Sequence, residues 1–177
     1  LRSRLPIITQ GLGARNKVDA PTATWDHSRA YLERARGQGA GVYSMLMARP
    51  FNRRFTLAEG TSLFEAVFPF QRLFNEAETV EERMAMLRDP EYRDSIRHSV
   101  ETPNRDASIG STLPPPHLEL VEIYRASKPE NQKLSGRPIA EIAREQGVAP
   151  MDLMVDVALS EDLDVEFIWR TETEEWK

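Results

Sequence analysis

Cysteine is absent from this chain of 177 residues, which excludes disulfide bonds and thiolate metal ligands. Basic residues are not in excess either, because 23 lysines and arginines are outnumbered by 28 aspartates and glutamates, giving a net charge of −5. Such a chain has no basic patch to attract nucleic acid or an anionic membrane. No apolar run approaches the ~18 residues that a spanning helix requires. We therefore expect a cytoplasmic protein that binds neither nucleic acid nor membranes.

Several catalytic motifs are also missing. The sequence has no Gly-x-Gly-x-x-Gly, no phosphate-binding loop and no Gly-x-Ser-x-Gly, so dinucleotide binding, nucleotide hydrolysis and serine hydrolysis have no support. The histidines His27, His98 and His117 are scattered, and no two have the spacing of metal ligands. We interpret each as a surface or capping residue.

The first third of the chain has the pattern of a βαβ unit. Residues 5–9 and 41–47 are rich in β-formers, and between them an amphipathic run beginning after Thr22 or Thr24 ends at Gly37 and Gly39. This order predicts two parallel strands joined by a helix. The first residue is Leu1, directly before a strand-like run, and we interpret the sequence as a segment of a longer chain.

The middle of the chain predicts helices. Apolar residues recur through 62–74, although Pro69 prevents a single helix there, and Thr79 with Glu82 forms a capping box. Asp89 and Pro90 are suited to the cap and first turn of a further helix. The aromatic residues of this region either cover a pocket or form the core of the insert; they are Phe64, Phe68, Phe70 and Phe74.

A long irregular loop over residues 101–116 follows and ends in three prolines. Its polar residues could contact a ligand or could simply form turns; they are Asn104, Arg105, Asp106, Ser111 and Thr112. The prolines 114–116 are either a rigid spacer or a docking motif for a proline-binding partner.

The last third carries the most specific pattern. Residues 136–143 read GRPIAEIA, Gly147 is suited to a left-handed helix stop, and Pro150 opens a second amphipathic helix that ends at Glu161-Asp162. Residues 165–170 alternate as a final strand. Together with the earlier elements, this order resembles a segment of the N-acyl-D-amino-acid deacylase group of metal-dependent amidohydrolases, and the resemblance covers most of the chain.

The resemblance implies an α/β fold, a partial (β/α)₈ TIM barrel with a mostly helical insertion. By this analogy residues 1–50 form a βαβ unit of a parallel barrel, residues 51–134 the helical insertion and proline-rich loop, and residues 135–177 a helix pair and strand that return to the barrel. A complete barrel needs ~250 residues, so the chain would be only part of one.

The resemblance also implies amide hydrolysis, in which a bound zinc in the full-length parent lowers the pKa of its water to ~7. Family members carry a histidine ligand near the end of the first strand, whereas this chain reads Ile7-Ile8-Thr9-Gln10-Gly11 there. Either this member holds fewer metals, or it is not a metallohydrolase of the usual kind. We expect no metal to be held by this chain, and the fragment to be inactive alone.

Three residues, Arg49, Arg53 and Tyr43, are candidates for binding a small amide substrate. Arg49 follows a strand expected to end at the barrel mouth, with Arg53 and Arg54 nearby, and a guanidinium binds a carboxylate through two parallel hydrogen bonds. Alternatively these arginines are solvated or paired with acids. Tyr43 either faces the barrel interior or is a core residue with a bonded hydroxyl.

A rival hypothesis is a non-catalytic α/β lid or assembly module that has lost the metal site. In either case a two-strand parallel unit leaves sheet edges and one face uncovered. We therefore expect the chain to associate with the remaining segments of the same protein or with copies of itself.

Overall fold

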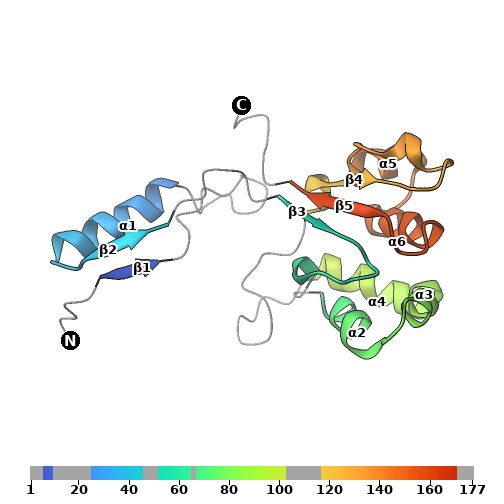
Figure 1. Ribbon diagram of the computed structural model, residues 1–177, viewed down its shortest axis with the longest axis horizontal. Helices are drawn as coiled ribbons and strands as arrows, with labels where there is room; N and C mark the ends of the chain where they lie inside the picture. Colours follow the sequence, from blue (N-terminus) through green and yellow to red (C-terminus); the bar gives the residue numbers. More distant parts are fainter. Residues whose placement is uncertain (1–5, 10–24, 46–51, 65–66, 103–116, 171–177) are drawn as a thin grey trace. The chain divides into compact units, whose positions relative to one another are not determined.

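The computed structural model describes residues 6–9, 25–45, 52–64, 67–102 and 117–170, and the side chains of 25–28 are not among them (Figure 1). The protein is mixed α/β. It divides into two compact units, one within residues 1–52 and the other spanning Arg53–Arg170.

The first unit contains the predicted strand, helix and strand: β1 (Ile7–Thr9), α1 (Trp25–Gly37) and β2 (Val42–Ser44). The strands are parallel, with Ile7 opposite Val42 and Thr9 opposite Ser44. Val42 is buried, and its carbonyl accepts a 3.0 Å hydrogen bond from Arg36 Nε near the end of α1. The βαβ prediction is confirmed in order and direction, with strands shorter than the apolar runs.

The second unit contains a three-stranded antiparallel sheet in the order β3-β5-β4. Its strands are β3 (Arg53–Phe55), β4 (Val121–Arg125) and β5 (Glu166–Trp169). β5 lies in the centre and pairs with both neighbours, so the expected return of residues 165–170 to a parallel sheet is wrong. The described residues contain no closed barrel, and a partial TIM barrel is not confirmed by them.

The described part of the second unit contains five helices (Figure 1). They are α2 (Phe68–Glu76), α3 (Val80–Arg88), α4 (Pro90–Glu101), α5 (Ile139–Gln146) and α6 (Pro150–Ser160). Of these, α5 lies beside β4. Short 3₁₀ turns occupy Ser62–Phe64, Leu118–Leu120 and Gln132–Leu134.

The helix boundaries follow the signals in the sequence. Thr79 accepts from Glu82 N at 3.2 Å, and the Glu82 carboxylate accepts from Thr79 N at 3.1 Å, so the predicted capping box of α3 is confirmed. The side chain of Asp89 accepts from Glu91 N at 2.9 Å and caps α4. Pro69 lies in the first turn of α2, where its missing N–H costs no helix hydrogen bond.

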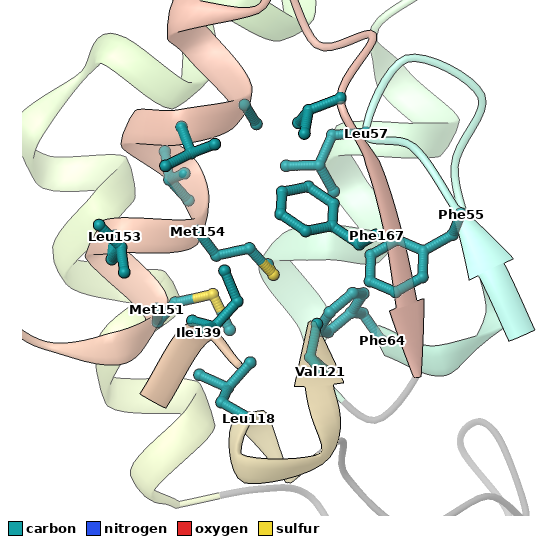
Figure 2. Packing of buried hydrophobic residues seen from close by; sticks show 14 of the residues in the cluster. Phe55, Leu57, Phe64, Leu118, Val121, Ile139, Met151, Leu153, Met154 and Phe167 are labelled. Carbon is teal, nitrogen blue, oxygen red and sulfur yellow. The ribbon is translucent and has the colours of Figure 1, made fainter. Parts of the chain in front are cut away.

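The core of the second unit lies between the sheet and the helices. Figure 2 shows Met154 of α6 beside Phe167 of β5, with Phe55 and Phe64 close by. The rings of Phe55 and Phe167 stack at 5.4 Å between centroids, and those of Phe64 and Phe70 at 4.6 Å. Of the aromatic residues of the insert, Phe64 and Phe70 therefore lie in the core, whereas Phe68 is 40% exposed and Phe74 is half-buried.

Candidate functional site

Arg53 is the predicted site residue with the most informative contacts. It begins β3, and strand alternation places it on the same face as Phe55, which is buried in the core. Its Nη1 atom donates to Ser62 Oγ at 2.8 Å. The guanidinium is thereby joined to the loop that leads from β3 towards α2.

That loop and α2 line a cavity of about 510 Å³. The cavity volume falls within the range of about 300–1,000 Å³ that is usual for small-molecule sites. The lining residues combine two aromatic rings with carboxylate, hydroxyl and amide groups: Glu59, Gly60, Thr61, Ser62, Phe64, Gln71, Phe74 and Asn75. We call this hollow the Thr61–Ser62 cavity.

The hydroxyl oxygens of Thr61 and Ser62 each accept one hydrogen bond within the protein. Thr61 Oγ1 accepts from Leu63 N at 3.2 Å, and Ser62 Oγ accepts from Arg53 Nη1. A hydroxyl has one donor proton besides its acceptor lone pairs. Both O–H groups therefore remain able to donate to a ligand oxygen.

The turn that carries these hydroxyls is held against α2. Gly60 has φ +89°, and an added Cβ would lie 3.1 Å from carbons of the Phe74 ring. The guanidinium of Arg83 lies 5.9 Å from the centroid of the same ring and donates to the carbonyl of Ala58. The cavity wall is therefore fixed by contacts from both sides of the turn.

Trp169 is a residue that the sequence did not single out. It lies opposite Arg53 in the β3-β5 register and is buried, yet its indole Nε1 has no hydrogen-bond partner among the residues that the structure describes. A buried unpaired N–H is costly, and such groups often mark a place where an acceptor belongs. The sequence alone could not reveal it, because β5 was expected in a different sheet.

The other predicted substrate-binding residues are placed differently. Tyr43, in the first unit, is not a core residue: it is 56% exposed, with the guanidinium of Arg36 5.8 Å from its ring centroid. Arg54 lies on the opposite face of β3 from Arg53 and forms an ion pair with Glu166 at 3.3 Å. Arg49 lies outside the described residues, as do the loop residues 104–106 and 111–112.

The described part of the chain shows no group of three or more histidine, cysteine, aspartate or glutamate side chains that could hold a metal ion. His98 lies in the last turn of α4, and His117 precedes a 3₁₀ turn. The side chain of His27 is not described. The residues that the structure describes therefore do not fit a zinc centre.

No helix of the described residues is long and apolar enough to cross a membrane. In comparisons with known proteins, no family model matches the chain, and no curated protein or solved structure matches it either. The case for a function therefore depends on the residues and their geometry.

Proposed function

We propose that this chain is part of an enzyme that hydrolyses a small amide, resembling the N-acyl-D-amino-acid deacylases, and that it is inactive alone. In this proposal the first unit supplies strands to a parallel (β/α)₈ barrel. The second unit is the insertion, and it supplies substrate-binding groups.

The observation that carries the proposal is the parallel pair β1-β2. Parallel strands occur almost entirely in sheets covered on both faces, because their crossover helices require it. Here two strands are joined through one helix, and Ile8 and Tyr43 lie opposite each other with 66% and 56% of their surfaces exposed. Such a pair is suited to be extended and covered by further strands and helices.

Within this proposal Arg53 binds the carboxylate of the substrate. A guanidinium and a carboxylate make charge-assisted hydrogen bonds, about twice as strong as neutral ones. In this proposal the metal ligands lie in the remainder of the enzyme, because the described residues of this chain contain no group of three or more side chains that could hold a metal ion.

The test is an assay of N-acyl-D-amino acids with added zinc, using the full-length parent and the 177-residue chain in parallel. We expect turnover by the parent and none by the chain alone. In the parent, Arg53→Ala should raise KM roughly 10-fold or more with little change in kcat, since it removes a charged hydrogen bond made before the transition state. Arg72→Ala is the matched control, because Arg72 is exposed and pairs only with Glu76 among the residues the structure describes. Turnover by the chain alone, or an unchanged KM for Arg53→Ala, would contradict the proposal.

A second candidate is a non-catalytic lid or assembly module. It is favoured by two observations. The second unit has a hydrophobic core of its own, with residues from Phe55 to Trp169, and its described side chains include no group that could hold a metal ion. Metal analysis of the intact parent separates the two candidates: bound zinc, nickel or iron supports the hydrolase, and a metal-free parent without turnover supports the module.

A further inference from the structure

We propose that the Thr61–Ser62 cavity is a binding site for a free α-amino acid with an apolar side chain, held as the zwitterion. Binding at this site requires no metal, and the site shares Arg53 with the proposed hydrolase through the bond of Arg53 to Ser62. The proposal combines a donor pair, an acceptor and an apolar surface within one hollow of the second unit.

The donor pair is formed by Thr61 and Ser62. Each hydroxyl oxygen already accepts a hydrogen bond, from Leu63 N and from Arg53 Nη1 respectively. Among the described residues no acceptor is bonded to their O–H protons, so these can donate to a ligand oxygen. The guanidinium of Arg53, bonded to Ser62, favours a ligand oxygen that carries negative charge. Adjacent donors beside a guanidinium are suited to the two oxygens of a carboxylate.

The acceptor is Glu59, two residues before Thr61. Glu59 lines the cavity and is exposed, and its carboxylate has no hydrogen bond or ion pair within the part of the chain that the structure describes. Its own backbone N–H is bonded to Thr56 Oγ1 at 3.1 Å, which fixes the start of the turn. A carboxylate at this position can accept from a ligand ammonium. The hollow therefore offers a negative charge at Glu59 for the ligand ammonium, and hydrogen-bond donors at Thr61 and Ser62 for the ligand carboxylate.

The accessible apolar surface is provided by Phe74, because Phe64 is only 1% exposed. Phe64 is buried in the core, whereas Phe74 is half-buried, and both line the hollow. The close approach of Gly60 to the Phe74 ring keeps the polar turn and the apolar wall side by side. A ligand that places ammonium and carboxylate on the turn therefore directs its side chain towards aromatic surface, which favours an apolar side chain over a charged one.

Calorimetric titration of the full chain with phenylalanine tests the site, with phenylacetate and phenethylamine as probes that each lack one charged group. We expect saturable binding of phenylalanine, and binding at least 10-fold weaker for either probe, because each loses a charge-assisted interaction. No saturable binding of phenylalanine, or equal affinity for all three compounds, would overturn the proposal.

Two variants separate the binding of the ligand carboxylate from the binding of the ligand ammonium. Thr61→Val with Ser62→Ala should weaken phenylalanine about 10-fold or more and leave phenethylamine unchanged, whereas Glu59→Gln should weaken phenylalanine and leave phenylacetate unchanged. Glu59 is exposed, and its side chain makes no hydrogen bond or ion pair among the described residues, so Glu59→Gln should fold normally. This variant therefore tests the site even if the double variant unfolds. If Glu59→Gln binds phenylalanine as tightly as the unaltered chain, the assignment of the ammonium end is wrong. If the chain binds phenylalanine but the full-length parent does not turn over N-acyl-D-amino acids, only the hydrolase proposal is refuted. If the parent shows turnover but the chain does not bind phenylalanine, only the amino-acid site is refuted.

Discussion

At the scale of single residues, Glu161 is a buried charge of the second unit. It is 3% exposed, and its carboxylate accepts from Ser127 N at 2.8 Å, from Lys128 N at 3.1 Å and from Asn131 Nδ2 at 2.8 Å. The next two residues, Asp162 and Leu163, have φ values of 56° and 64°, a conformation that costs free energy in residues other than glycine. The carboxylate therefore ties the strained turn after α6 to the loop after β4.

Glu161→Ala should lower the free energy of unfolding by about 2–3 kcal/mol, because it leaves buried donors without an acceptor. Urea unfolding measures the change. Asp164→Ala is the control: Asp164 is exposed, and its side chain makes no described contact, so its effect should stay within about 0.5 kcal/mol. An equal loss in both variants would show that the carboxylate of Glu161 does not hold the turn.

The same residue predicts a pH dependence. Burial raises the pKa of Glu161, but hydrogen bonds from Asn131, Ser127 and Lys128 outweigh burial and hold its pKa below the ordinary value of 4.5. A carboxyl group with a lowered folded-state pKa contributes stability that is complete above 4.5 and is lost as the pH falls through the lowered pKa.

The stability difference between the unaltered chain and Glu161→Gln should therefore be constant from about pH 6 to 8 and shrink below pH ~4.5. Chemical unfolding at a series of pH values measures it. A difference that grows on acidification would reverse the sign of the assigned shift.

At the scale of elements, the turn between α5 and α6 depends on one backbone conformation. Gly147 has φ +69°, and its N–H bonds to the carbonyls of Ala143 and Arg144 at the end of α5. An added Cβ would meet nothing within 4 Å, so the cost of a side chain here is backbone strain without a clash.

Gly147→Ala should therefore destabilise the second unit by about 1–2 kcal/mol, the cost of a left-handed L-residue. Gly147→Asn should cost less, since asparagine tolerates this conformation. Thermal unfolding of the two variants gives the comparison, and equal losses would mean that something other than φ decides the effect.

At the scale of the whole molecule, the open β1-β2 pair predicts association. We expect the chain to self-associate in a concentration-dependent way in sedimentation experiments. Among the described residues the outer edges of β1 and β2 have no strand beside them, and these edges and the exposed Ile8 favour pairing with another copy. Ile8→Lys should weaken this association, whereas Val148→Lys, at a 43% exposed position beyond α5, should leave it unchanged. A monodisperse monomer would contradict the prediction.

The sequence by itself determined the local elements of this protein. Capping residues such as Thr79 and Asp89, the proline at position 150 and the glycine at position 147 set helix ends through short-range hydrogen bonds and backbone geometry, and these predictions are confirmed. Such signals act within a few residues, so they can be read without knowing the neighbours in space.

Only the tertiary structure decided which strands pair. β4 and β5 are separated along the chain by two helices, and β3 precedes β5 by more than 100 residues, so no local pattern indicates that they form one antiparallel sheet. The same holds for the bond of Arg53 to Ser62, the buried N–H of Trp169 and the grouping of Glu59 with Phe74. Strand pairing and cavity formation depend on contacts between distant segments, and these contacts are set by burial of the shared core rather than by the residues next to each strand.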